Sequence, residues 1–382
     1  MNSFFEIIRA GINTTFQDTG RNNLNHIGIP SSGAMDNRNY RLANSIVGNN
    51  IGSPVIEFAY QGPLLKYKGE KIKIVVTGDV FFKIKKKGHE IEGNCYESYL
   101  IENNDEIDIV STNKSVYGYL AISGIIDLSL QWNSCSINTK ANIGSNDGKK
   151  LAKNQKIKIQ KINDNLRPQK LNYLNTRIEK IRVIKGTNFN FFSENGKKIF
   201  FEKEFNITKH SDRMGMRLEG ENIENIFEEN IRSEGLVKGT VQVPSDGNPI
   251  IMLSDHGTIG GYPKIAAVIT ADFDKLVQLP PGSKIKFKKG VIVNKNELIS
   301  AMSGASNLSQ TQCTEALQTF INTVTNELKS GSEVKIIGFG TFKISKRKAT
   351  TGRNPQTGAA IQIPASNQPK FSAGKALKEA VN

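Results

Sequence analysis

Short apolar runs separated by turn residues recur along the first 288 residues, and this spacing is the strongest constraint on the fold. Runs such as KIKIVVTG, EIDIVS, YGYLAIS, KIRVIKG, TVQVP and PIIMLSD alternate with clusters of Gly, Asn, Asp and Pro. This is the pattern of many short strands joined by turns. In NRNYRLANSIVG, by contrast, Tyr40, Ala43, Asn44 and Val47 recur on one helical face. We therefore predict a mainly β N-terminal part with a helix within 37–48.

The pattern changes at Val293. Asn294 and Glu297 have the spacing of a capping box, and Ser309 and Gln312 repeat it before a second helix that the segment KSGS ends. Strand-like segments and a short helix, FSAGKALKEAVN, follow. We predict a small α+β domain over 293–382, joined without a Gly/Ser linker. The apolar stripe of its second helix comprises Ala316, Leu317, Phe320, Ile321, Val324 and Leu328.

Charge separates the two parts of this 382-residue chain, whose formal net charge is +15. Residues 293–382 hold 11 basic and 5 acidic residues, whereas the first 292 hold 40 and 31. An AT-rich genome, which inflates Lys, Asn and Ile everywhere, explains the diffuse excess, while the denser charge of the tail points to a polyanionic partner. With three scattered cysteines, no apolar run of membrane-spanning length and no signal peptide, we expect a cytoplasmic protein without a metal site.

Two positively charged, strand-like arms flank the segment TGRNPQTG at 351–358. The cations of these arms can contact phosphates. The alternative explanation of the same charges is that they keep an exposed edge strand soluble. Taken alone, Pro355 within this segment is explained as an ordinary turn proline. Because the apolar helix stripe would stay uncovered in a monomer, we expect an intertwined dimer. The arm cations are Lys343, Lys346, Arg347, Lys348 and Arg353.

Three motifs of the tail resemble the bacterial histone-like HU/IHF family over the whole of 293–382. They are GFGTF (338–342), GRNPQTG (352–358) and FSAGKALKEAVN (371–382), in the order and spacing of that family. As established for such minor-groove architectural proteins, the resemblance implies a dimer that bends double-stranded DNA with little sequence preference, with Pro355 as an apolar wedge. Arg353 and Asn354 would accompany the wedge, and Lys375 and Lys378 would contact phosphates from the dimer body.

Three stretches of the β-rich part, 11–49, 210–220 and 231–273, are rich in glycine and polar residues. Loops that converge on a polar ligand have this composition, and loops that merely connect strands are the alternative. The segment GTIGGYPK lacks the GK[ST] ending of a Walker loop, so it is not a P-loop.

Motifs within these stretches resemble the C subunit of bacterial 5-oxoprolinase, a family also called biotin-dependent carboxyltransferase or allophanate-hydrolase-subunit-2 type. They are TTFQDTGR, GIPSSGAMD, ANSIVGN, SDRMGMRLEG, SEGLVKGTVQVPSDG and TIGGYPK, and the resemblance runs from about residue 4 to 288. It implies paired cyclophilin-like β-barrel subdomains, at about 1–162 and 178–288, and partners like the A and B subunits of that enzyme. With these partners, family members cleave 5-oxoproline to glutamate using ATP with Mg. A biotin-attachment motif is absent, so no biotin is expected on this chain.

Residue types assign candidates for opening a lactam ring, which needs an activated carbonyl and a held carboxylate. Arg213 and Lys264 have the charge to clamp a carboxylate or phosphate. Gly260 and Gly261, followed by Tyr262, let a cofactor approach the backbone closely. The carboxylates expected to hold a metal–nucleotide or to move protons are Asp18, Asp36, Asp212, Glu234 and Asp255.

The sequence thus predicts two domains, 1–288 and 293–382, and leaves three functions open. The chain is an enzyme subunit with a DNA-binding tail, or a nucleoid DNA-binding protein whose N-terminal part is an inactive scaffold. The third alternative is a regulatory module that binds a partner like the B subunit of 5-oxoprolinase. The HU-like tail implies a homodimer, and we expect the protein to be associated with the nucleoid.

Overall fold

The computed structural model describes residues 3–162, 166–173, 178–227, 230–290, 295–306, 308–347, 349–353, 360–363 and 365–381. The chain divides into two compact units, Met1–Val291 and Ile292–Asn382. Among the described residues, no helix is long and apolar enough to cross a membrane.

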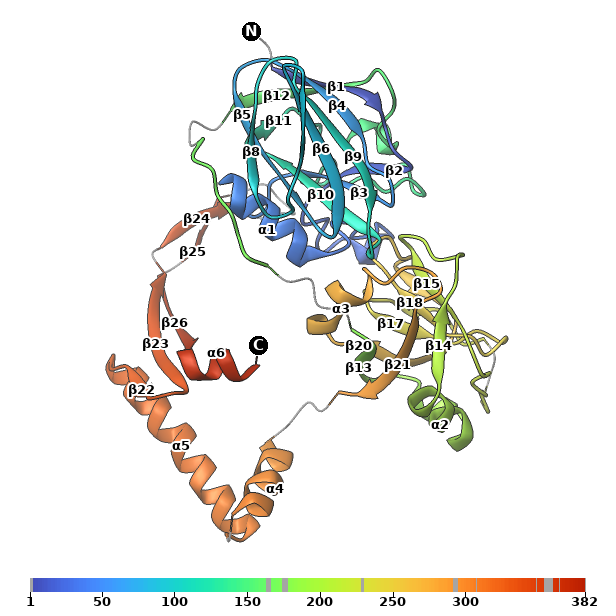
Figure 1. Ribbon diagram of the computed structural model, residues 1–382. Coiled ribbons are helices and arrows are strands. Elements are labelled where there is room, and N and C mark those ends of the chain that lie inside the picture. Colours follow the sequence, from blue (N-terminus) through green and yellow to red (C-terminus); the bar gives the residue numbers. More distant parts are fainter. Residues whose placement is uncertain are drawn as a thin grey trace. The chain divides into compact units, whose positions relative to one another are not determined.

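The first subdomain of the N-terminal unit consists of two β-sheets with a core between them (Figure 1). Phe5, Tyr67 and Ile107 of one sheet are buried in the same cluster as Phe58 and Leu120 of the other. The seven-stranded sheet has the order β11 (Gly124–Ile126), β12 (Lys156–Ile162), β1 (Phe4–Arg9), β4 (Leu64–Lys68), β9 (Glu106–Thr112), β6 (Val80–Lys86), β7 (His89–Glu92). The five-stranded sheet has the order β2 (Asn13–Gln17), β3 (Val55–Ala59), β10 (Tyr117–Ile122), β5 (Ile72–Thr77), β8 (Ser98–Ile101).

Helix α1 (Asn37–Val47) packs against strands β5 and β10 of the five-stranded sheet. Its side chains at Tyr40, Ala43, Asn44 and Val47 are buried, which confirms the predicted apolar face. The helix begins at the Asp36 cap, and it ends at Gly48, whose φ of 83° is a left-handed conformation that glycine adopts without strain.

The second subdomain is a closed barrel, which confirms a mainly β N-terminal part; of the two expected barrel subdomains, this one closes, and the first consists of the two sheets described above. Two short helices, α2 (Glu194–Glu202) and α3 (Thr270–Leu276), were absent from the predicted pattern because each has too few apolar repeats to show a helical period. The barrel order is β13 (Lys180–Lys185), β20 (Lys264–Val268), β17 (Thr240–Gln242), β18 (Ile250–Met252), β15 (Gly215–Glu219), β14 (Glu204–Ile207), β21 (Lys284–Lys289). A separate two-stranded sheet pairs β16 (Glu234–Gly235) with β19 (Ile259–Gly260).

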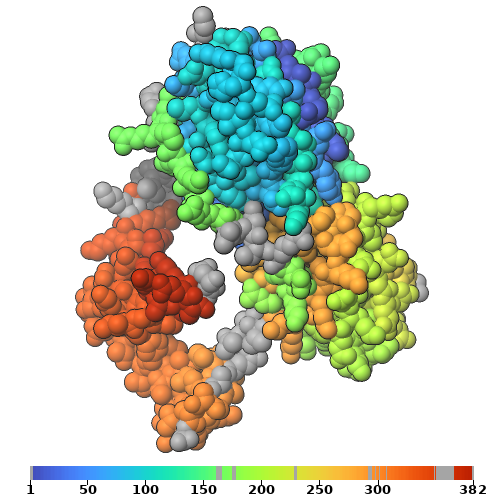
Figure 2. Space-filling view, viewed as in Figure 1, coloured from blue at the N-terminus to red at the C-terminus, as the bar shows by residue number. Residues whose placement is uncertain are grey.

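One apolar cluster runs through both subdomains and makes the N-terminal unit a single body. It includes Tyr40 and Val47 of α1 together with Phe200, Val241 and Phe287 of the second subdomain. Figure 2 shows the surfaces of the two subdomains, blue to teal and yellow to orange, in direct contact. The connection expected at 163–177 lies partly outside the described residues.

The C-terminal unit is α+β, as predicted. Helix α4 (Lys295–Ala305) precedes α5 (Gln310–Ser330), and the capping box of Ser309 and Gln312 is confirmed. Phe320 and Ile321 on α5 are 42% and 41% exposed in a single copy of the chain. A three-stranded sheet has the order β22 (Val334–Ile336), β23 (Gly340–Arg347), β26 (Ser366–Ala373), and a two-stranded arm pairs β24 (Thr350–Arg353) with β25 (Ala360–Ile363) before α6 (Lys375–Val381).

Candidate functional site

The three polar stretches of the N-terminal unit meet at the side chain of Arg213. Its Nε donates a hydrogen bond to Asp255 Oδ2 at 2.8 Å, and its Nη2 donates to the Gly33 carbonyl at 2.8 Å. Its Nη1 donates to Glu57 on β3, so the guanidinium joins the first subdomain to the second. Burial would lower the Arg213 pKa, but Asp255 and Glu57 outweigh it and raise this pKa. The guanidinium is therefore permanently charged and compensated inside the protein.

A ligand-clamping role for Arg213 stays a prediction. The residue is 8% exposed, and two protein carboxylates already accept hydrogen bonds from its side chain. A bound carboxylate or phosphate would have to share the guanidinium with Asp255 and Glu57. The geometry indicates that Arg213 mainly serves to connect the two subdomains.

Asp18 and Asp36 lie in separate hydrogen-bond networks. Burial would raise the Asp18 pKa, but donors from Ser134 and Ser136, at 2.7 and 2.6 Å, hold this pKa below its usual range. The Asp36 carboxylate caps α1 by accepting from Asn39 N at 2.9 Å, and it accepts from Gln278 Nε2 at 2.9 Å. Burial, with the charge of Asp274, raises the Asp36 pKa to about 6.

The shifted Asp36 pKa predicts a pH-dependent stability of the N-terminal unit. A raised folded-state pKa gives stability that is present in acid and is lost as pH rises through about 6. We expect a gain of about 1 kcal/mol between pH 7 and pH 5 from this group. Burial lowers the pKa of His256, which opposes the trend but is common to wild type and variant. Urea unfolding followed by Trp132 fluorescence should show the increment in wild type and not in Asp36→Asn. Equal pH profiles for the two proteins would exclude this role of Asp36.

A second polar group lies beside the two-stranded sheet β16–β19. The buried Lys264 Nζ donates to Glu234 Oε2 at 2.8 Å, and the Glu234 side chain is 46% exposed. Two of the predicted catalytic residues therefore form a pair, with the carboxylate facing solvent. Tyr262 is 39% exposed and its carbonyl accepts from Gln242 Nε2 at 3.0 Å.

Close packing explains why glycine occupies positions 260 and 261. A Cβ at Gly260 would lie 2.8 Å from the Gln242 amide and 2.8 Å from Leu236, and one at Gly261 would lie 3.2 Å from the Ile231 carbonyl. A side chain at either position would be crowded by this chain, so packing also explains the two glycines. Cofactor binding at Gly260, Gly261 and Tyr262 stays a prediction.

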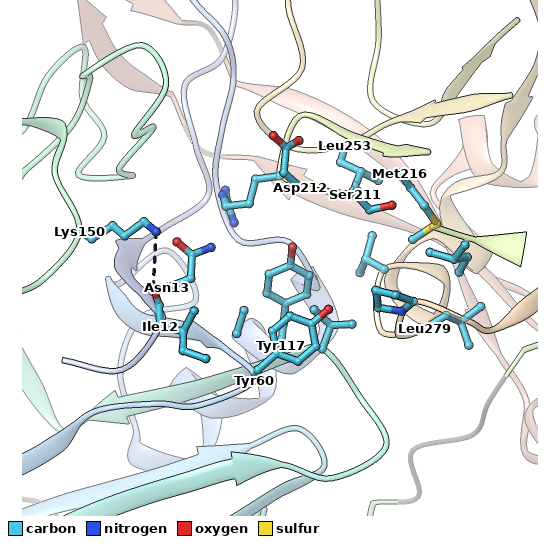
Figure 3. Close-up of a pocket in the computed structure, with 16 residues that line it drawn as sticks. Ile12, Asn13, Tyr60, Tyr117, Lys150, Ser211, Asp212, Met216, Leu253 and Leu279 are labelled. Carbon is cyan, nitrogen blue, oxygen red and sulfur yellow. Dashed lines mark hydrogen bonds between the residues drawn. The ribbon is translucent and has the colours of Figure 1, made fainter. Parts of the chain in front are cut away.

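A cavity of about 240 Å³ opens between the two subdomains (Figure 3). Tyr60 and Tyr117 come from the first subdomain, Ser211 and Asp212 come from the second, and both subdomains contribute aliphatic side chains. Tyr60 has a φ of 61°, a conformation that is strained for an aromatic residue. The cavity combines ring faces with a few polar groups, the usual composition of a small-molecule site. Its other lining residues include Asn13, Lys150, Arg213, Met216, Leu253 and Leu279.

Two charged residues were missed by sequence reasoning, the buried Glu57 and the half-buried Lys238. Glu57 lies in a strand whose five residues are all buried, and an acid in such a strand requires a cation partner, which was the available signal. Burial lowers the Lys238 pKa to about 8, and its Nζ lies 3.4 Å from the Met35 carbonyl and 4.3 Å from the centre of the Phe273 ring. Within the described residues, no cluster of three His, Cys, Asp or Glu side chains could hold a metal ion.

The candidate DNA-binding residues that the structure describes lie on strands β23 and β24 and on helix α6. Lys346 and Arg347 are exposed at the end of β23, and Lys343 is half-buried on the same strand. Arg353 ends β24, and Lys375 and Lys378 are exposed on α6. Three further predicted residues, Lys348, Asn354 and Pro355, lie outside the described part of the chain.

Comparison with known proteins identifies both units. A family model described as "Carboxyltransferase domain, subdomain A and B" matches residues 27–289, and one described as "Bacterial DNA-binding protein" matches residues 293–382. The C subunit of 5-oxoprolinase from Escherichia coli (strain K12) is 31% identical over 288 residues, which are 74% of this chain and 90% of that protein. The DNA-binding protein HU of Pasteurella multocida (strain Pm70) is 53% identical over 89 residues, which are 23% of this chain and 99% of that protein.

Two solved structures are similar to this chain over a share that corresponds to the N-terminal unit. The Kluyveromyces lactis urea carboxylase is similar with a TM-score of 0.68 and 26% identity over 78% of this chain. The present chain spans 29% of that protein, and 56% of a second solved chain that is similar with a TM-score of 0.67. The chain therefore belongs to the carboxyltransferase domain (subdomain A and B) family through its N-terminal unit and to the bacterial DNA-binding protein family through its C-terminal unit.

Proposed function

We propose that the C-terminal unit binds double-stranded DNA with little sequence preference and bends it. The exposed cations of β23 support this function, because Lys346 and Arg347 stand at the base of the β24–β25 arm with solvent-facing side chains. Neutralising phosphates with such side chains is the main source of sequence-independent affinity. In this proposal the protein is associated with the nucleoid.

The C-terminal unit acts as a homodimer in this proposal. Phe320 and Ile321 on α5, together with Phe339 and Phe371, are each more than 40% exposed in a single copy. The Phe371 ring contacts Phe339 and Phe342, with centroids 5.2 and 4.8 Å apart. Phe342 in turn contacts Phe320, at 6.3 Å, so these rings form one continuous aromatic cluster. A second copy would remove this apolar surface from water.

The N-terminal unit serves, in the same proposal, as a subunit of an amide hydrolase of the 5-oxoprolinase type. The observation that supports this is the Lys264–Glu234 pair, in which the lysine is buried and the carboxylate is open to solvent. Lys264 would bind an anionic substrate group, and Glu234 would move a proton at the substrate amide. ATP with Mg would bind in the complex that this chain forms with partners like the A and B subunits of that enzyme.

A scaffold or regulatory module for a partner like the B subunit is the second candidate. It is favoured because several predicted catalytic residues make hydrogen bonds within the protein itself. Arg213 and Asp255 pair with each other, and Asp36 caps a helix. In that case the N-terminal unit binds its partner without turnover.

Reconstitution with the A and B subunits of 5-oxoprolinase separates the two candidates. We expect ATP-dependent turnover of 5-oxoproline that falls at least about tenfold in Lys264→Gln and in Glu234→Gln, because each loses one half of the pair. Lys198→Gln, at an exposed position on α2, is the matched control and should keep the wild-type rate. Binding to the partners without any turnover would reject the enzyme and leave the scaffold.

A further inference from the structure

The outer surface of the second subdomain carries a row of cations on two neighbouring strands, β13 and β21. We call this row the β13–β21 face; it consists of Lys180, Arg182, Lys284, Lys286 and Lys288. The strands are parallel, and their register places Lys180 opposite Lys286 and Arg182 opposite Lys288. Residues between them along each strand, such as Ile181 and Phe287, are buried in the barrel core. The cations therefore share one solvent-facing side.

Like charges in register are an exception in this protein. Elsewhere in the sheets of the N-terminal unit, charged partners across described strands are of opposite sign, as in Glu6 with Lys156 and Lys83 with Asp108. The one other Lys/Arg pair in the described registers is Lys343 with Lys370, on the sheet of the DNA-binding unit. Like charges directly opposite each other destabilise a sheet. The β13–β21 face thus repeats the charge arrangement of the sheet that carries the DNA-binding arm.

Carboxylates neutralise only part of this face. Arg182 pairs with Asp272 at 2.6 Å. Glu204 stands opposite Lys286 in the register of β14 with β21, but its carboxylate lies 3.7 Å from Lys284, and both of these side chains are largely exposed. Among the described residues, three cations of the face have no carboxylate within salt-bridge distance: Lys180, Lys286 and Lys288. A polyanion in contact with the face would supply the missing opposite charge.

We propose that the β13–β21 face is a second contact surface for duplex DNA and that it binds the phosphates of the same molecule that the C-terminal unit holds. This inference rests on the DNA binding proposed above. Only five residues separate Lys289, the end of β21, from Lys295, the start of α4. A chain of that length spans at most about 20 Å, so DNA bound by the C-terminal unit is at high local concentration for the face. The contact adds affinity and length of bound DNA, and no sequence preference.

The test compares three variants of the full chain by titration with a long duplex at several salt concentrations. The face variant is Lys180→Gln/Lys286→Gln/Lys288→Gln, and the matched control is Lys66→Gln/Lys83→Gln/Lys85→Gln, whose lysines face carboxylates in the seven-stranded sheet. Each lost phosphate contact lowers the slope of log affinity against log salt by roughly 0.9, so the face variant should lose up to about 2.7 per bound chain. The control should keep the wild-type slope.

The third variant, Lys343→Gln/Lys346→Gln/Arg347→Gln, separates this inference from the DNA binding on which it rests. If the arm variant weakens binding while the face variant matches the control, the second contact surface is rejected and the DNA-binding unit stands. If neither variant differs from wild type, DNA binding by both surfaces is rejected.

Two further measurements, of stability to urea and of lysine labelling, control for unfolding of the face variant. The face variant should be at least as stable to urea as wild type, because its substitutions remove repulsion between Lys180, Lys286 and Lys288. In the wild-type protein, duplex DNA should protect Lys286 and Lys288 from an amine-reactive label and leave Lys85 reactive. Equal labelling of all three lysines with and without DNA would overturn the proposal.

Discussion

Replacing Arg213 with methionine should destabilise the N-terminal unit by about 3–5 kcal/mol, the usual cost of removing one partner from a buried ion pair. The substitution leaves Glu57 and Asp255, 2% and 5% exposed, without a cation between them. It also removes the hydrogen bond to the Gly33 carbonyl, which crosses from one subdomain to the other. Urea unfolding followed by Trp132 fluorescence, in the first subdomain, measures the change.

A charge-neutral rescue distinguishes the loss of a cation from the loss of packing. The triple variant Arg213→Met/Glu57→Gln/Asp255→Asn removes all three charges together and should recover much of the lost stability. Arg217→Met, at an exposed position on β15, is the matched control and should change stability by less than about 0.5 kcal/mol. A single variant as stable as wild type would show that the subdomains do not depend on Arg213.

Neutralising the arm cations should weaken binding to duplex DNA by about a hundredfold near physiological salt, because three phosphate contacts per chain are lost. The variant is Lys343→Gln/Lys346→Gln/Arg347→Gln, in which glutamine keeps most of each aliphatic stem. Fluorescence anisotropy of a labelled duplex, titrated at several salt concentrations, measures both the affinity and its salt dependence.

The matched control for the arm is Lys329→Gln/Lys335→Gln, which removes charge from the end of α5 and from β22 in the same unit. It should bind DNA nearly as wild type does, and circular dichroism should show the same melting for both variants. Equal affinities of the arm variant and this control for duplex DNA would show that the arm cations do not contact the DNA.

The local pattern of the sequence was enough to predict the class of both units. Alternating runs predicted a mainly β first part, the periodicity around Tyr40 predicted α1, and the spacing of Ser309 and Gln312 predicted the start of α5. These features depend on residues a few positions apart, where periodicity and capping chemistry act.

Partners that are distant in sequence could not be predicted in this way. Arg213 meets Glu57 across 156 positions, and only the fold brings them together. The register that places Lys180 beside Lys286 is likewise set by closure of the barrel. From the charge counted along the chain, the excess positive charge of the first 292 residues was therefore attributed to overall composition. The structure shows that part of this positive charge lies on the β13–β21 face.

The most direct test of the central claim, that the C-terminal unit bends DNA while attached to a folded N-terminal unit, is energy transfer between dyes at the two ends of a duplex titrated with the full chain. The claim predicts that the ends approach on binding, that intact, nicked and cruciform DNA all bind, with preference for the distorted forms, and that added salt weakens binding in each case. A chain that binds none of these duplexes in dilute buffer, or that binds them without bringing the ends closer, would contradict it.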